Sequence, residues 1–142
     1  MIENSKNEEE TIKIAFKIGA SLRGGDILSL VGNLGVGKTV FTKGLSKCLG
    51  VKSGVKSPTF TLMNVYRAKN DQGIKSICHI DAYRLNSASD LLNIGAQDFF
   101  DDQETLTVIE WGDKVRDILP RRSKMVVIEA LSENNRKICF KK

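Results

Sequence analysis

The chain has 142 residues, of which 41% are hydrophobic and 27% are charged, a balance that predicts one globular domain covering residues 1–142. No apolar run approaches the roughly 20 residues that a membrane-spanning helix needs. The first ten residues lack the apolar centre of a signal peptide and the three cysteines are scattered, so we expect a cytoplasmic protein with no membrane partner. The net charge of +5 weakly favours acidic partners such as nucleotides or RNA.

The N-terminal part of the chain predicts a helix, a strand and a second helix. Asn7 and Glu10 have the spacing of a helix N-cap and its capping partner. Apolar or small residues then recur at helical spacing up to a break at residues 23–25, namely Ile12, Ala15, Phe16, Gly19 and Leu22. An apolar strand, Ile27–Val31, leads through a glycine-rich loop into a helix over 38–49.

The rest of the chain alternates strands with short helices. The expected strands are 61–66, 74–80, Thr105–Glu110, 124–131 and 137–140, and the expected helices are 87–94 and 114–119. Residues 69–73 predict a hairpin turn between the first two of these strands. This order of elements predicts an α/β fold with a mixed central sheet flanked by helices.

The glycine-rich loop, GNLGVGKT at residues 32–39, matches the pattern G-x-x-x-x-G-K-[ST] without a mismatch. Its glycines let consecutive backbone N–H groups point at phosphate oxygens, and the helix that follows adds its positive end. Lys38 is expected to reach the β- and γ-phosphates, and the Thr39 hydroxyl to bind Mg²⁺. The motif predicts a P-loop NTPase-like domain whose nucleotide-binding residues are Gly32, Asn33, Leu34, Gly35, Val36, Gly37, Lys38, Thr39 and Val40.

A phosphate loop of this kind needs a carboxylate for the metal, placed at the end of a buried strand. Asp81 and Glu110 each follow such an apolar run. One could hold Mg²⁺ while the other orients or deprotonates the attacking nucleophile, and the residues alone leave that assignment open. His79 lies two residues before Asp81, and both a structural and a functional role are open for it.

The segment SPTFTL, residues 57–62, is a second stretch of unusual composition. Pro58 favours an extended backbone, and Thr59 and Thr61 place hydroxyl groups near the end of a strand. In nucleotide switches such a threonine senses the γ-phosphate and the metal. The same pattern is also compatible with an ordinary loop before a strand.

The segments GNLGVGKT, SPTFTL, HIDAYRL and IEW occur in the order and spacing of the bacterial TsaE family, formerly called YjeE. The resemblance covers nearly the whole chain. It implies a small ATPase that binds ATP with Mg²⁺ and releases ADP. This ATPase is needed for threonylcarbamoyl modification of adenosine 37 in tRNA. It also implies that the chain acts with a TsaB–TsaD pair, so that tRNA is an indirect partner.

The resemblance also assigns roles to residues. It places the Mg²⁺ ligands at Thr39 and Glu110, a water-positioning aspartate at Asp81, and a switch loop with Thr61 at SPTFTL. Contacts on the base side of the nucleotide fall on a threonine in the first helix and an arginine in the last strand, and the nearest matches are Thr11 and Arg136.

Two positions depart from the family pattern. Family members usually carry glycines near the arginine of the last strand, whereas this chain has SENNRK at residues 132–137, which puts the base contact of Arg136 in question. Gly112 stands where an alanine or proline is common, a difference that we expect to matter little.

Two other function classes stay open beside the ATPase. A free-standing small-molecule kinase usually has a mobile lid with arginines, and the sequence contains no insertion of that size. A nucleotide-dependent adaptor would need binding without turnover. Guanine specificity is not expected, because the chain lacks an N-K-x-D motif.

Overall fold

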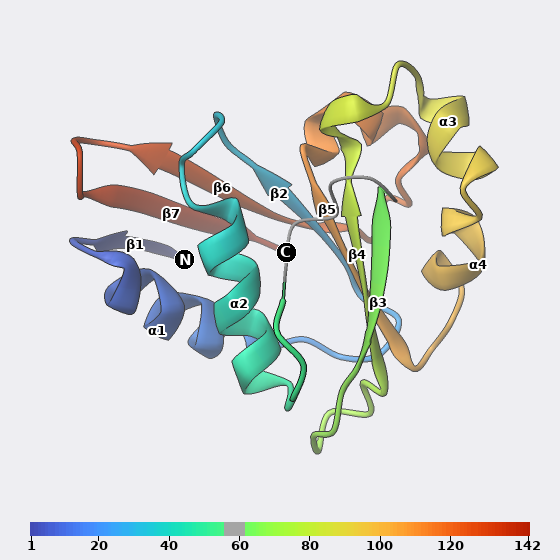
Figure 1. The fold of residues 1–142 in the computed structure, drawn as a ribbon, viewed down its shortest axis with the longest axis horizontal. Coiled ribbons are helices and arrows are strands. Elements are labelled where there is room, and N and C mark those ends of the chain that lie inside the picture. Colours follow the sequence, from blue (N-terminus) through green and yellow to red (C-terminus); the bar gives the residue numbers. More distant parts are fainter. Residues whose placement is uncertain (56–61) are drawn as a thin grey trace.

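The computed structural model describes residues 1–55 and 62–142 of the chain. The described residues form a seven-stranded mixed sheet in the order β1-β7-β6-β2-β5-β4-β3, with helices on both faces (Figure 1). The expected α/β fold is therefore confirmed. None of the helices in these two ranges has the length and apolar character that crossing a membrane requires.

The elements have the following bounds. The strands are β1 (Ile2–Ser5), β2 (Ile27–Val31), β3 (Met63–Arg67), β4 (Ser76–Asp81), β5 (Thr105–Glu110), β6 (Lys124–Ala130) and β7 (Arg136–Lys141). The helices are α1 (Glu8–Gly19), α2 (Lys38–Cys48), α3 (Ala88–Asn93) and α4 (Ala96–Phe100), with the 3-10 helices η1 (Ala82–Arg84) and η2 (Gly112–Ile118).

The centre of the sheet is parallel. β2 pairs in parallel with both β5 and β6, and β4 pairs in parallel with β5. The antiparallel pairs β1–β7, β6–β7 and β3–β4 complete the two sides. Because parallel strands run in one direction, β2, β4 and β5 end at the same edge of the sheet, where the loop between β2 and α2 also lies (Figure 1).

Two hydrophobic clusters hold the layers together. The larger one joins α1 and α2 to one face of the sheet through residues that include Phe41, Leu28 and Val108. The smaller one joins α3, α4 and η2 to the other face through residues that include Leu91 and Ile109. Buried residues alternate between the two clusters along β2 and β5, as expected for strands that are covered on both faces.

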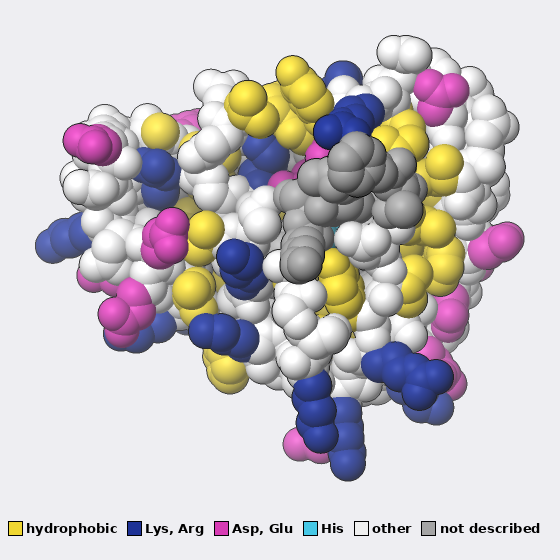
Figure 2. Space-filling model, in the orientation of Figure 1, with side chains coloured by type: hydrophobic (Ala, Val, Ile, Leu, Met, Phe, Trp, Pro, Cys, Tyr) yellow, Lys and Arg dark blue, Asp and Glu magenta, His cyan; other side chains and the backbone are white. Residues whose placement is uncertain are grey.

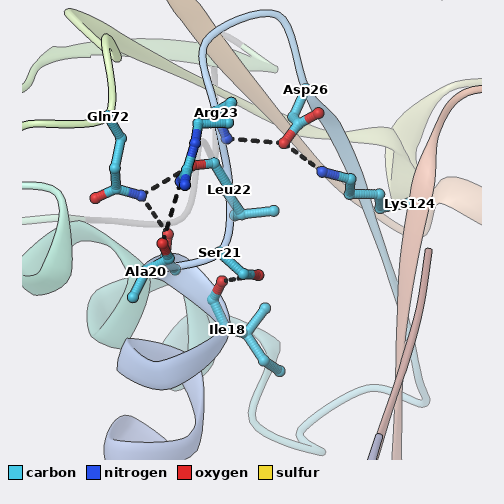
Figure 3. Close-up of polar contacts among 9 residues, drawn as sticks. Ile18, Ala20, Ser21, Leu22, Arg23, Asp26, Gln72 and Lys124 are labelled. Atoms are coloured by element: carbon cyan, nitrogen blue, oxygen red, sulfur yellow. Dashed lines mark hydrogen bonds and ion pairs between the residues drawn. The ribbon is translucent and has the colours of Figure 1, made fainter.

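The first helix ends earlier than its sequence pattern predicts. α1 stops at Gly19, four residues before the break expected at residues 23–25. Side chains bond the carbonyl groups at this end of the helix, from the nearby Ser21 and Arg23 and from the distant Gln72 (Figure 3). The Gln72 amide donates to the carbonyl oxygens of Gly19 at 2.7 Å and Leu22 at 2.9 Å. These tertiary contacts fix where the helix ends.

Other expected elements differ in detail. The Asn7 cap is confirmed, because its side chain accepts a hydrogen bond from the Glu10 backbone N–H at 2.8 Å. Phe16 was expected on the buried face, yet it is 49% exposed, since α1 turns Ile14 and Ile18 inward instead. The helix expected at 114–119 is the kinked 3-10 helix η2. The elements β1, α4 and η1 were not anticipated.

The contact between α1 and α2 depends on Gly44. A β-carbon at this position would lie 2.6 Å from Ala15 Cβ and 2.8 Å from the carbonyl oxygen of Ile12. Glycine is a poor helix former, so its presence in the middle of α2 costs helix stability. The close approach of the two helices requires it nevertheless, and this approach sets the position of α2 below the glycine-rich loop.

We expect Gly44→Ala to lower the free energy of unfolding by about 1–3 kcal/mol, because the added methyl group collides with backbone in a packed interface. The same substitution on an open helix surface would stabilise the helix by about 1 kcal/mol. Chemical denaturation measures the difference. Gly54→Ala, outside the helices, is the control for steric contact, because no heavy atom of the described residues beyond its chain neighbours lies within 4 Å of the added β-carbon. Stabilisation by Gly44→Ala would show that the helices do not pack this closely.

Candidate nucleotide-binding site

The glycine-rich loop lies between the end of β2 and the start of α2. Gly35 and Gly37 have φ angles of 76° and 108°, in the left-handed region that side chains disfavour. Gly37 precedes the first turn of α2, and its carbonyl oxygen accepts a hydrogen bond from the Phe41 N–H at 2.9 Å. The loop therefore presents the N-terminal end of a helix, which attracts anions.

The first glycine of the loop is needed for packing. A β-carbon at Gly32 would lie 2.7 Å from the carbonyl oxygen of Ile128 in β6 and 2.7 Å from a methyl group of Val36. Gly32 and Asn33 line a hollow of about 550 Å³ between the loop and β6, on the outer side of the loop. Both residues contribute to the site through their carbonyl groups.

Those carbonyl groups hold Lys38. Its ammonium nitrogen lies 2.6 Å from the carbonyl oxygen of Gly32 and 2.9 Å from that of Asn33. The same nitrogen lies 4.1 Å from the centre of the Trp111 ring, a cation–π distance. Burial lowers the pKa of Lys38, while the negative charges of Glu110, Asp81 and Asp113 act in the opposite direction. Lys38 thus combines a buried ammonium group with three negative charges in its surroundings.

The two candidate carboxylates lie on neighbouring strands. Asp81 ends β4 and Glu110 ends β5, and the two residues are paired in the parallel register. Glu110 is 4% exposed, and its Oε2 lies 2.7 Å from Nε2 of His79. Asp81 is more accessible and accepts a hydrogen bond from the backbone N–H of Tyr83 at 3.0 Å. The pair therefore combines a buried, fixed carboxylate with a more exposed one.

These residues surround one pocket of about 290 Å³, which is lined by Leu34, Gly35, Gly37, Lys38, Thr39, Val40, Asp81, Glu110 and Trp111. Figure 2 shows dark blue and magenta side chains close together at this edge of the molecule. The described residues contain no group of three or more His, Cys, Asp or Glu that could hold a metal by itself. The Thr39 hydroxyl and one carboxylate fit Mg²⁺, which is usually held by few protein ligands together with phosphate oxygens and water.

A second pocket of about 210 Å³ adjoins the outer side of the loop, and its lining includes Thr11, Arg136, Gly35, Gly37 and Val40. The sheet and α1 therefore bring together the two residues expected near the base. Arg136 Nε donates to the carbonyl oxygen of Val36 at 2.9 Å, and its Nη1 donates to the carbonyl oxygen of Ser132 at 2.9 Å. Arg136 thus ties the turn at residues 132–135 to the phosphate loop.

Thr11 is engaged inside the protein. Its hydroxyl group shares a 2.8 Å hydrogen bond with the hydroxyl of Ser5, and the residue is only 4% exposed. Thr11 also donates to the carbonyl oxygen of Asn7 at 3.3 Å. The hydroxyl group is therefore used to fix α1 against β1, and the side chain presents little surface to the pocket.

Several residues of the site were not identified from the sequence. Trp111 has a left-handed backbone with φ of 59°, and its ring lies 5.0 Å from the ring of Tyr83. Lys114 donates to the carbonyl oxygen of Tyr83 at 2.7 Å. These contacts join η1 to η2 beside the pocket. The HIDAYRL and IEW segments were the available signal, but the tilted contact between their aromatic rings depends on the turns that follow β4 and β5.

Gly112 is more important than its sequence context suggests. A β-carbon at this position would lie 1.8 Å from Oγ of Ser29 in β2. The expectation that glycine here matters little is therefore wrong for this chain, because Ser29 occupies the space that an alanine would need. Thr59 and Thr61, the candidate switch residues, lie outside the described residues.

Comparisons with known proteins identify the family. Residues 5–138 match the family model described as "Threonylcarbamoyl adenosine biosynthesis protein TsaE". The "tRNA threonylcarbamoyladenosine biosynthesis protein TsaE" of Aquifex aeolicus (strain VF5) is 40% identical over 137 residues, covering 94% of this chain and 90% of the relative. The protein of the same name from Bacillus subtilis (strain 168) is 37% identical over 134 residues, covering 94% and 80%.

A solved structure agrees with this match. The crystal structure of YdiB from Bacillus subtilis aligns with a TM-score of 0.74 at 30% sequence identity, covering 99% of this chain and 83% of that chain. Family model, relatives and structure all extend over nearly the whole chain, including the phosphate loop and both candidate carboxylates. This chain belongs to the TsaE family.

Proposed function

We propose that this chain is a cytoplasmic ATPase that binds ATP with Mg²⁺ and takes part in the N6-threonylcarbamoyladenosine modification of tRNA. Residues 1–142 act as one domain in this proposal. The observation that carries it is the pocket in which the phosphate loop, Lys38, Asp81 and Glu110 meet. The family contributes the process, because its members are named for threonylcarbamoyladenosine biosynthesis.

Each polar residue of the pocket has a role in this proposal. Lys38 leaves its loop carbonyls and binds the β- and γ-phosphates, which satisfy the buried cation better than neutral dipoles do. Thr39 and Glu110 hold Mg²⁺, which when bound neutralises charge that develops on the phosphates. Asp81 orients the attacking water, since its carboxylate is the more accessible of the two. Thr11 and Arg136 line the second pocket beside the phosphate loop, where the base would lie.

The chain acts with a TsaB–TsaD pair in this proposal, and its contact with tRNA is indirect. The family resemblance supports this partnership. A kinase is the less favoured alternative, because the sequence contains no lid-sized insertion and the described residues that line the nucleotide pocket include no arginine. An adaptor that binds nucleotide without needing turnover has the same pocket, and rate measurements separate it from the ATPase.

We expect Lys38→Ala to weaken ATP binding tenfold or more, because it removes a charge-assisted contact that is worth about 1.5–3 kcal/mol. Calorimetric titration of the folded variant measures the loss. Lys43→Ala is the matched control, since Lys43 is an exposed lysine of the same helix and lies outside the pocket lining. Unchanged ATP affinity in a folded Lys38→Ala protein would exclude the proposed binding mode.

The two carboxylates should respond differently to substitution. Glu110→Gln should weaken Mg²⁺-dependent ATP binding, because an amide is a poorer ligand for Mg²⁺ than a carboxylate. Asp81→Asn should leave ATP binding within about twofold of the unmodified protein and abolish turnover, because an amide cannot accept the proton of the attacking water. Binding assays and phosphate release measure the two effects. If Asp81→Asn weakens binding and Glu110→Gln abolishes only turnover, the two carboxylates have the opposite roles. Equal loss of binding in both variants would indicate that they share the metal site.

The partner should stimulate the enzyme. The isolated chain should hydrolyse ATP slowly, because groups supplied by a partner commonly complete such sites. Phosphate release should rise clearly when a TsaB–TsaD pair is added, and Thr61→Ala should remove the rise if Thr61 is the sensing residue. Fast hydrolysis by the isolated chain that responds to a small-molecule acceptor instead would favour the kinase. Binding without turnover under either condition would favour the adaptor.

A further inference from the structure

The contact between His79 and Glu110 has no role in the proposed function so far. His79 is fully buried in β4, and its Nε2 lies 2.7 Å from Oε2 of Glu110 on the neighbouring strand β5. In the register of the sheet, His79 is paired with Val108 and lies two residues before Asp81. The ring therefore lies under the end of β5, directly next to the carboxylate that borders the pocket.

The direction of this hydrogen bond is set by the chemistry of the two groups. A carboxylate that binds Mg²⁺ is ionised and can only accept, so in the metal-binding state the tautomer of His79 with its proton on Nε2 donates to Glu110. The other ring nitrogen, Nδ1, is buried and has no hydrogen-bond partner among the described residues. Packing inside the sheet therefore holds the ring, and its one polar contact is directed at Glu110.

A side chain held in this way restricts the carboxylate it touches. The end of a glutamate side chain rotates over a broad range unless it is bonded. The 2.7 Å bond to Oε2 therefore restricts the rotation of the Glu110 carboxylate. Donors that orient a metal-binding group in this way usually change metal affinity by about 10- to 100-fold when they are removed.

We propose that His79 is a positioning residue for Glu110, holding its carboxylate in the orientation that receives Mg²⁺ together with bound nucleotide. This inference rests on the proposed function, in which Glu110 is a metal ligand. A purely structural alternative is that His79 only satisfies a buried carboxylate. In that case its loss would lower stability without changing the contribution of the metal to nucleotide binding.

The test is the ratio of the ADP dissociation constants measured in EDTA and in Mg²⁺, determined by calorimetry on the whole chain. His79→Leu removes the donor and fills the buried position with an apolar side chain of similar size. We expect it to lower the ratio by about tenfold and to leave the affinity in EDTA within about twofold. His79→Gln restores an N–H donor near the position of Nε2 and should recover most of the ratio.

Ile77→Val is the matched control, because Ile77 is a fully buried residue of the same strand and is paired with Leu106, away from Glu110. It should lower the melting temperature and leave the ratio unchanged. If His79→Leu does not fold, His79→Asn replaces it, since the shorter amide does not reach Glu110. The ratio of the ADP dissociation constants should then stay near the wild-type value in His79→Gln and fall in His79→Asn.

The outcomes separate this inference from the proposed function. A wild-type protein that binds ADP no better in Mg²⁺ than in EDTA would overturn both. A normal wild-type ratio that His79→Leu leaves intact would overturn only the positioning role. Equal loss of the ratio in the Leu and Gln variants would also overturn it, because the restored donor would then have no effect.

Discussion

Parallel pairing of β2, β4 and β5 is the constraint on which the site depends. The register places Glu110 beside Asp81 on one side and beside Leu30, the penultimate residue of β2, on the other. Because side chains alternate along a strand, a slip of one residue would turn Glu110 to the opposite face. The phosphate loop begins directly after β2, so the same register brings Lys38 to the two carboxylates.

Burial makes the charges of the site interdependent. Lys38 and Glu110 are 5% and 4% exposed, and an isolated charge at either position would be strongly unfavourable. Loop carbonyls, the Trp111 ring and carboxylates surround the lysine, and His79 bonds the glutamate. Phosphate groups entering this pocket would replace neutral contacts of Lys38 with charged ones. Stabilisation of the empty protein and recognition of an anion therefore use the same side chains.

Small residues determine how closely the elements around this pocket approach. Gly44 allows α2 to pack on α1, Gly32 allows the loop to contact β6, and Gly112 allows the turn after Glu110 to cover Ser29. A β-carbon added at any of these three glycines would collide with the neighbouring element. Trp111, which precedes Gly112, adopts a left-handed backbone in the same turn. The rigid placement of Lys38 and Glu110 thus rests on tight backbone contacts as well as on hydrogen bonds.

The sequence by itself determined the elements whose signals are local. Glycine spacing and an apolar run predicted β2, the phosphate loop and α2, the Asn7 cap predicted the start of α1, and a second apolar run predicted β5 with Glu110 at its end. Only the tertiary structure shows that the distant Gln72 bonds carbonyl groups at the end of α1, and which partner His79 has. It also decided that Gly112 has no room for a side chain. These features depend on residues that are distant in the chain, and only strand pairing and helix packing bring them together.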